Sequence, residues 1–166
     1  MMPQPDAKAF RNALGQFATG VTVVTTADAD GNKIGMTANS FSSVSLDPML
    51  VLWSVAKSCK VFREFNEARH FAIHVLKAEQ LPISNQFASP CDDRFAGIET
   101  EQGIGGIPLL TDYCARFECE LEARYEGGDH VILVGRVVDF QNRGQETTPL
   151  IFHAGRYADL DIPVAI

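Results

Sequence analysis

The first clear hydrophobic pattern along the chain is helical. Between Asp6 and Thr19, apolar residues recur three and four positions apart, at Phe10, Ala13, Leu14, Phe17 and Ala18. This spacing places them on one face of a helix, and Asp6 before them and Gly20 after them are typical start and stop signals. The pattern therefore predicts an amphipathic helix over 6–19.

Most of the remaining chain has the pattern of β-strands. β-branched runs and alternating apolar positions predict long strands at Val21–Thr26, Lys33–Ser40, Leu50–Val55, Phe71–Leu76, Ala115–Tyr125 and His130–Phe140, and short ones at Pro149–Phe152 and Gly155–Tyr157. An Asp-Gly pair separates the first two strands and predicts a hairpin. Gly135 interrupts an apolar strand, which is typical of a bend or bulge at a barrel corner.

Two further helices are predicted between the strands. Ser58 can cap a helix that carries Val61, Phe62 and Phe65 on one face, and 78–88 is helical in character with Pro82 near its first turn. The Gly-rich stretch 90–108 is irregular and too long for a passive connector, so we expect it to form a lid or an interface arm.

The order of these elements predicts a mainly β fold. Six or more strands joined by hairpin-type connections, with a few peripheral helices, indicate an all-β barrel or a β-rich α+β domain rather than a βαβ series. The length of 166 residues predicts a single domain over 1–166.

Net charge and cysteine spacing limit the ligands, partners and compartment that we expect for this protein. A net charge of −7 opposes binding to nucleic acid or to an anionic membrane, so an anionic ligand would need a local cationic pocket. The four cysteines show neither a CxxC motif nor zinc-ligand spacing, and we interpret them as free thiols. The apolar runs are too short to span a bilayer, and we expect a cytoplasmic protein.

Several common chemistries have no signature in the sequence. The chain contains no GxSxG elbow, no HExxH or HxH arrangement among its four histidines, and no GxxxxGK[ST] loop. The Gly-rich run Gly103–Gly106 does not lie between a buried strand and a helix. Serine hydrolase, metal-dependent and P-loop or Rossmann functions are therefore unsupported, and no metal ligand is predicted.

Two polar segments indicate a ligand site instead. GMTANSFSSVSLDP, from Gly35 to Pro48, places neutral hydroxyl and amide groups at positions of both parities, whereas SVAKSCK, from Ser54 to Lys60, brings hydroxyls and the Lys57 ammonium to a predicted helix start. The second combination suits a phosphate. The first suits the edge of a heteroaromatic ring such as a flavin. The alternative is that Ser58 only caps the helix and Lys57 is solvated.

His130 and Tyr157, both in the C-terminal third of the chain, each allow two interpretations. His130 opens an apolar strand and either hydrogen-bonds a neighbouring carbonyl or orients a second ligand by stacking or hydrogen bonding. Tyr157 is either a core residue or a wall against which a ring stacks.

Five segments in the same order resemble the flavin reductase family of the FMN-binding split-barrel fold, in particular the reductase components of two-component flavin-dependent monooxygenases. They are FATGVTVVTT, GMTANSFSSVSLDP, SVAKSCK, GDHVILVGRV and IFHAGRY. The resemblance implies a split β-barrel homodimer that binds FMN or FAD near the dimer interface. One departure is Met49, where many relatives have a second proline after Asp47-Pro48.

The resemblance also implies which residues bind the cofactors. Contacts to the flavin ring and ribityl chain would come from Thr37, Ala38, Asn39 and Ser40, and contacts to the lower ribityl chain and phosphate from Ser54, Val55, Ala56, Lys57 and Ser58. Asn85, Phe87 and Arg94 would line the same pocket. His130 would place the nicotinamide nucleotide, with Tyr157 close by.

The implied reaction is hydride transfer from NADH or NADPH to FMN or FAD, followed by release of reduced flavin to a partner monooxygenase that acts on an aromatic substrate. Such a site needs no strong general base, because the cofactors carry the chemistry and the protein supplies proximity. Two alternatives are a non-catalytic flavin-binding protein and a flavoprotein of the pyridoxamine-phosphate-oxidase type that retains its flavin.

Overall fold

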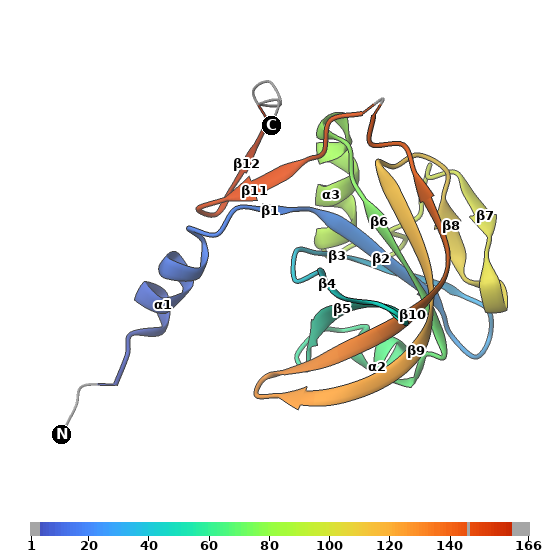
Figure 1. Ribbon diagram of the computed structural model, residues 1–166, viewed down its shortest axis with the longest axis horizontal. Coiled ribbons are helices and arrows are strands. Elements are labelled where there is room, and N and C mark those ends of the chain that lie inside the picture. The colour runs from blue at the N-terminus through green and yellow to red at the C-terminus, as the bar shows by residue number, and fades with distance from the viewer. Residues whose placement is uncertain (1–3, 146, 161–166) are drawn as a thin grey trace.

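A seven-stranded antiparallel sheet forms the body of the computed structural model, which describes residues 4–145 and 147–160 (Figure 1). Its strand order is β3-β2-β6-β9-β10-β5-β4. The bounds are β2 Thr22–Ala27, β3 Lys33–Ala38, β4 Ser42–Leu46, β5 Met49–Ala56, β6 His70–Val75, β9 Ala115–Gly127 and β10 His130–Asn142. The predicted mainly β fold is thereby confirmed.

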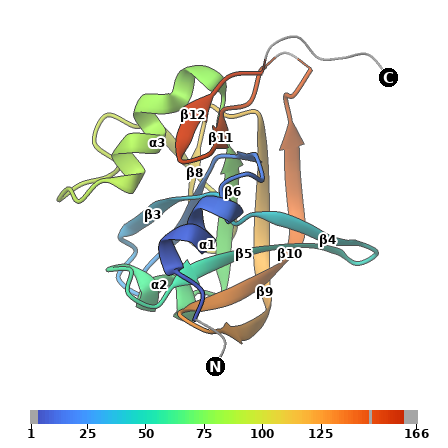
Figure 2. The ribbon, with the colours of Figure 1, turned by 90° about the vertical axis from the view of Figure 1, so that its left-hand side faces the viewer.

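Smaller elements surround this sheet. β1 (Thr19–Gly20), β11 (Ile151–His153) and β12 (Arg156–Ala158) form a three-stranded sheet, and β7 (Thr100–Gln102) pairs with β8 (Pro108–Leu110). The helices are α1 Ala7–Leu14, α2 Phe62–Glu67 and α3 Leu81–Ala88, with 3-10 turns η1 Ala78–Gln80 and η2 Ile104–Gly106. The large sheet curls on itself (Figures 1 and 2), whereas α1 stands away from it (Figure 1).

The core of the curled sheet is built around Trp53 on β5. Its ring is fully buried and meets Phe65 of α2 edge-on, with ring centroids 4.9 Å apart, and Phe71 of β6 at 6.2 Å. Gly135 makes this packing possible, because a Cβ at that position would lie 2.5 Å from Cζ of Phe71. The β9–β10 register shifts beside Gly135, as the glycine predicts.

His74 fixes β6 to two neighbouring strands. Its side chain is fully buried; Nδ1 lies 2.9 Å from the carbonyl oxygen of Val23, and Nε2 accepts the N–H of Leu110 at 3.0 Å. Desolvation by burial lowers the pKa of His74 to about 3. The ring is therefore neutral at pH 7, with its proton on Nδ1 so that both hydrogen bonds are made.

The N-terminal helix is shorter than its pattern predicts. It begins as expected, since the Asp6 carboxylate accepts the N–H groups of Lys8 and Ala9 at 3.1 and 3.2 Å. It ends at Leu14 rather than near Thr19, because Thr19 and Gly20 pair with β11. The competing strand pairing therefore sets the helix length.

One other prediction about local structure is wrong, and another is wrong in part. α2 begins at Phe62 with Val61 at its N-cap, so Ser58 caps no helix and lies in the turn that follows β5. The stretch 90–108 is not irregular throughout, because it includes β7, η2 and the start of β8, and its role as a lid or an interface arm stays a prediction. In addition, Ser42–Leu46 forms a largely exposed edge strand that the sequence pattern does not predict.

Candidate functional site

Hydrogen bonds connect the two polar segments that the sequence predicts as a ligand site, at the ends of β3 and β5. The Ser40 hydroxyl donates to the carbonyl oxygen of Ser54 at 3.1 Å and accepts the Ser54 N–H at 2.9 Å. This reciprocal contact brings Thr37–Ser40 beside Ser54–Ala56. Ser40 and Ser54 are half-buried, and Asn39 is exposed.

A cavity of about 620 Å³ opens beside Asn39. Its other walls come from α1 and the segment after it, from β1, and from the β11–β12 turn; they include Phe17, Thr19, Phe152 and Gly155. The Thr19 hydroxyl oxygen is buried and has no hydrogen-bond partner among the described residues. A buried hydroxyl without a hydrogen-bond partner is uncommon in folded proteins.

The turn after β5 carries the cation of the predicted phosphate site. The Lys57 N–H donates to the carbonyl oxygen of Asp129 at 2.9 Å, and its ammonium contacts the Glu126 carboxylate at 2.5 Å. Ser58 is exposed in the same turn. Because α2 begins only at Phe62, helix N–H groups do not converge here, and the groups that this turn offers to an anion are its backbone, its hydroxyls and the Lys57 ammonium.

The tip of the β9–β10 hairpin lies against this turn. His130 pairs with Ala56 of β5 on one side and with Gly127 of β9 on the other. The His130 Nδ1–H donates to the Asp129 carboxylate at 2.6 Å. This hydrogen bond, followed by the charge of the His130 ring, lowers the pKa of Asp129. The contact occupies Nδ1, and the ring is partly exposed to solvent.

Tyr157 belongs to a different part of the chain. Its hydroxyl lies 2.7 Å from the Ser84 hydroxyl on α3, and the Ser84 carbonyl oxygen accepts the Thr37 hydroxyl at 2.7 Å. Its ring meets Phe152 edge-on at 5.4 Å. Figure 1 shows β12 and the β9–β10 tip at different ends of the molecule, so one chain does not bring Tyr157 to His130.

The three residues expected to line the pocket from α3 and the following loop take different places. Asn85 is exposed on α3. Phe87 is fully buried and packs edge-on against Phe95 at 5.0 Å. Its ring is therefore part of the core next to β3 and does not line an open pocket. Arg94 donates to the Gly35 carbonyl oxygen at 2.9 Å and, with Lys60, lines a separate cavity of about 330 Å³.

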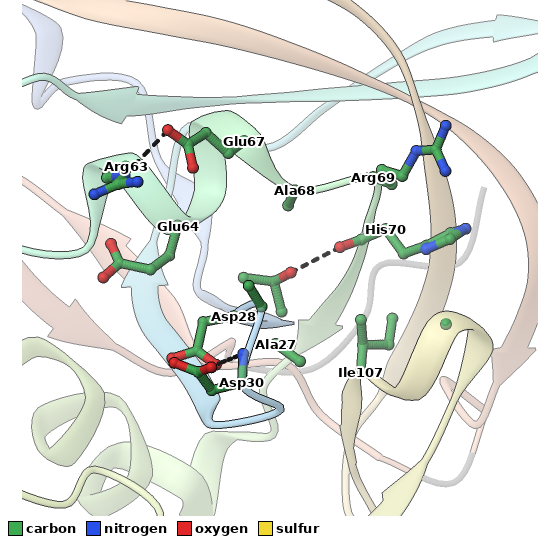
Figure 3. Close-up of a pocket in the computed structure, with 13 residues that line it drawn as sticks. Ala27, Asp28, Asp30, Arg63, Glu64, Glu67, Ala68, Arg69, His70 and Ile107 are labelled. Carbon is green, nitrogen blue, oxygen red and sulfur yellow. Dashed lines mark hydrogen bonds and ion pairs between the residues drawn. The ribbon is translucent and has the colours of Figure 1, made fainter.

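A further hollow of about 520 Å³ lies between the β2–β3 turn and α2 (Figure 3). Asp28 and Asp30 approach it from the turn, Arg63 pairs with Glu67 at 3.1 Å, and Thr26 donates to the His70 carbonyl oxygen at 2.8 Å. The residues in 4–145 and 147–160 contain no group of His, Cys, Asp or Glu that could hold a metal ion. We assign no site here.

Sequence reasoning missed the far wall of the Asn39 cavity. Phe17, Thr19, Phe152 and Gly155 lie in segments that are far apart along the chain and meet only because β1 pairs with β11. Their one signal was indirect, since both segments, FATGVTVVTT and IFHAGRY, carry the family resemblance.

Sequence comparison finds curated proteins that are similar to this chain. A curated relative from Rhizobium meliloti (strain 1021), named "Probable flavin reductase", is 51% identical over 84% of this chain and 45% of its own length. The "FMN reductase (NADH) SmoA" of Agrobacterium fabrum is 47% identical over 92% of this chain and 85% of its own. The chain thus spans about half the length of the first of these relatives.

Solved structures share the fold. The NADH:FAD oxidoreductase SgcE6 of Streptomyces globisporus C-1027, in complex with NAD and FAD fragments, matches with a TM-score of 0.88 at 35% identity, over 97% of this chain and 96% of that one. No helix in the described part of the chain is long and apolar enough to cross a membrane. The model of the "Flavin reductase like domain" family matches residues 14–161, and the chain belongs to this family.

Proposed function

We propose that this protein transfers a hydride from NADH or NADPH to FMN or FAD and supplies the reduced flavin to a partner monooxygenase. The observation that carries the proposal is a path along the chain: Asn39 lines the cavity, the adjacent Ser40 exchanges two hydrogen bonds with Ser54, and β5 leads from Ser54 to the Lys57 turn. The path places neutral hydrogen-bonding groups at one end and an ammonium at the other. A flavin mononucleotide has a matching ring edge and phosphate.

The residues on this path fit a flavin. A volume of about 620 Å³ is in the range of small-molecule and cofactor sites. In the proposal, Thr37, Ala38, Asn39 and Ser40 hold the ring and ribityl chain, Ser54, Val55 and Ala56 hold the lower ribityl chain, and Lys57 and Ser58 hold the phosphate. Val55 contributes through its backbone, because its side chain is buried.

The charge of the cavity agrees with flavin reduction. A bound flavin supplies the hydride-accepting chemistry, so the protein needs to exclude water and hold two planar ligands in contact. Among the described residues that line the cavity, Arg11 is the one charged side chain, and none is a carboxylate or histidine. The lining therefore contains no general base, as hydride transfer between cofactors allows.

His130 is the residue we assign to the nicotinamide nucleotide. The Asp129 carboxylate holds its Nδ1–H, and the strand pairing with Ala56 holds its backbone beside the proposed ribityl site. A fixed ring with Nε2 available can hydrogen-bond or stack on a second ligand. We place Tyr157 there only through a second copy of the chain.

The proposal includes a second copy of the chain, because the apolar side chains of α1 are exposed. None of the residues in Ala7–Leu14 is buried, and Phe10, Leu14 and Phe17 are 61%, 59% and 80% exposed. An eight-residue helix is marginal in water without tertiary packing. Since Leu14 and Phe17 also line the Asn39 cavity, a homodimer that covers α1 would close the flavin site.

The partner and the compartment follow from the same assignment. Relatives named as reductase components of monooxygenases, including "Flavin-dependent trigonelline monooxygenase, reductase component", support an oxygenase partner for this chain. The proposed location is the cytoplasm, where NADH is available and where the four free cysteines would stay reduced.

A steady-state assay tests the proposal. NADH or NADPH consumption should be slow with the protein alone and should rise in proportion to added FMN or FAD until the flavin saturates. This dependence on free flavin separates a reductase from an oxidase that retains its flavin. Binding of flavin without nucleotide consumption would instead support a non-catalytic flavin-binding protein.

A further inference from the structure

The Lys57 ammonium already has an anionic partner within the chain. The Glu126 carboxylate on β9 contacts it at 2.5 Å. The proposed function assigns the same ammonium to the flavin phosphate, and the present inference rests on that assignment. Carboxylate and phosphate oxygens both accept charge-assisted hydrogen bonds from an ammonium, so the two anions would compete for one cation.

The backbone around Lys57 holds this competition in place. The Lys57 N–H donates to the Asp129 carbonyl oxygen at 2.9 Å, and His130 pairs with Ala56 and with Gly127. These contacts fix the tip of the β9–β10 hairpin against the turn after β5. Glu126, beside Gly127 at this tip, therefore stays within reach of Lys57 whether or not a ligand is bound.

The two side chains are free enough to separate when a ligand arrives. The side chain of Lys57 is 42% exposed and that of Glu126 is 77% exposed, and an exposed pair of this kind is held weakly. A second carboxylate lies near the same lysine: the hydrogen bond from His130 and the charge of that ring chiefly lower the pKa of Asp129, and the charge of Lys57 adds the smallest contribution. A phosphate at Lys57 would therefore have two carboxylates nearby.

We propose that Glu126 competes with the flavin phosphate for Lys57 and thereby weakens flavin binding and speeds its release. The arrangement suits an enzyme that must pass its reduced flavin to another protein rather than retain it. Glu126 is then a residue that sets flavin affinity, without contact to the ring or the nicotinamide.

The test compares FMN with riboflavin, which has the same ring and ribityl chain but no phosphate. Dissociation constants are measured by quenching of flavin fluorescence for the wild type, Glu126→Gln, Lys57→Met and the double variant at one fixed salt concentration. Glu122→Gln is the matched control, because it removes the same charge from the same strand at a residue that pairs with Arg136 at 2.9 Å.

The proposal predicts that Glu126→Gln lowers the FMN dissociation constant by about two- to fivefold, the range that an exposed ion pair supports. Riboflavin affinity should stay the same, Glu122→Gln should have no effect, and the gain should vanish in the Lys57→Met background. The rate at which reduced FMN dissociates, measured by anaerobic stopped flow, should fall by a similar factor.

Three results would overturn the inference: an unchanged FMN dissociation constant in Glu126→Gln, an equal gain for riboflavin, or a gain that persists without Lys57. Each can occur while the wild type still reduces flavin, so failure of the inference is distinct from failure of the proposed function. Absence of both flavin binding and flavin reduction in the wild type would refute the two together.

Discussion

Replacing Lys57 by methionine tests the proposed phosphate site, because it removes the ammonium and keeps most of the side-chain volume. A hydrogen bond to a charged group contributes about 1.5–3 kcal/mol. Two features reduce this value here: the Lys57 side chain is 42% exposed, and its contact with Glu126 must break before a phosphate can bind. Such an exposed pair is itself worth about 0.2–1 kcal/mol.

The net expectation is a loss of about 1–2 kcal/mol in FMN binding, which raises the dissociation constant about five- to thirtyfold. Isothermal titration calorimetry with FMN and riboflavin measures it, and riboflavin affinity should change less than twofold because it lacks the phosphate. Arg63→Met is the matched control: it removes the same charge six positions away, on a side chain that pairs with Glu67 instead. Equal FMN affinity in Lys57→Met and the wild type would remove Lys57 from the site.

Three further predictions concern the nicotinamide site and the core. Replacing His130 by alanine should raise the KM for NADH about two- to tenfold, the value of one hydrogen bond, with little change in the FMN dissociation constant; equal kinetics would exclude His130 from the nucleotide site. Replacing Gly135 by alanine should cost about 1–3 kcal/mol of unfolding free energy, because the new Cβ would lie 2.5 Å from the Phe71 ring. In urea unfolding, Gly20→Ala should cost under about 0.5 kcal/mol, since the described residues leave nothing within 4 Å of its Cβ; similar losses at both positions would contradict this packing. Burial lowers the pKa of His74 to about 3, below the unfolded value near 6.5, so the unfolded chain binds the extra proton as pH falls between these values. Stability should therefore fall by up to about 1.4 kcal/mol per pH unit below pH 6.5, and His74→Gln should lack this component; the same pH dependence in both proteins would rule out His74 as its source.

The sequence predicts the sheet well because strand pattern and core packing agree there. The alternation along Ala115–Tyr125 and the apolar run from His130 match β9 and β10, and Gly135 marks their irregularity. Local signals were insufficient where tertiary contacts decide. Ser58 has the chemistry of a helix cap, but the turn after β5 continues to Val61 before α2 begins.

One part of the candidate site could be predicted from the sequence, and the other part could not. The segments 37–40 and 54–58 are near each other in the sequence, and their polar residues taken together favour a ligand site over the alternative of a capping Ser58 and a solvated Lys57. The opposite wall could not be found by local reasoning, because Thr19 and Phe152 meet through β1–β11 pairing across most of the chain. The position of Tyr157 could not be predicted locally either, because a tertiary contact, its hydrogen bond to Ser84, helps to fix it.

The central claim is that this protein passes a hydride from a nicotinamide nucleotide to a flavin that it then releases. The most direct test mixes the protein anaerobically with FMN or FAD and NADH or NADPH and follows the visible absorbance of the flavin. The proposed function predicts that the flavin bleaches over many turnovers with flavin in excess of protein, and that the reduced flavin passes an ultrafiltration membrane that retains the protein. No bleaching with any pair of flavin and nucleotide would contradict the claim.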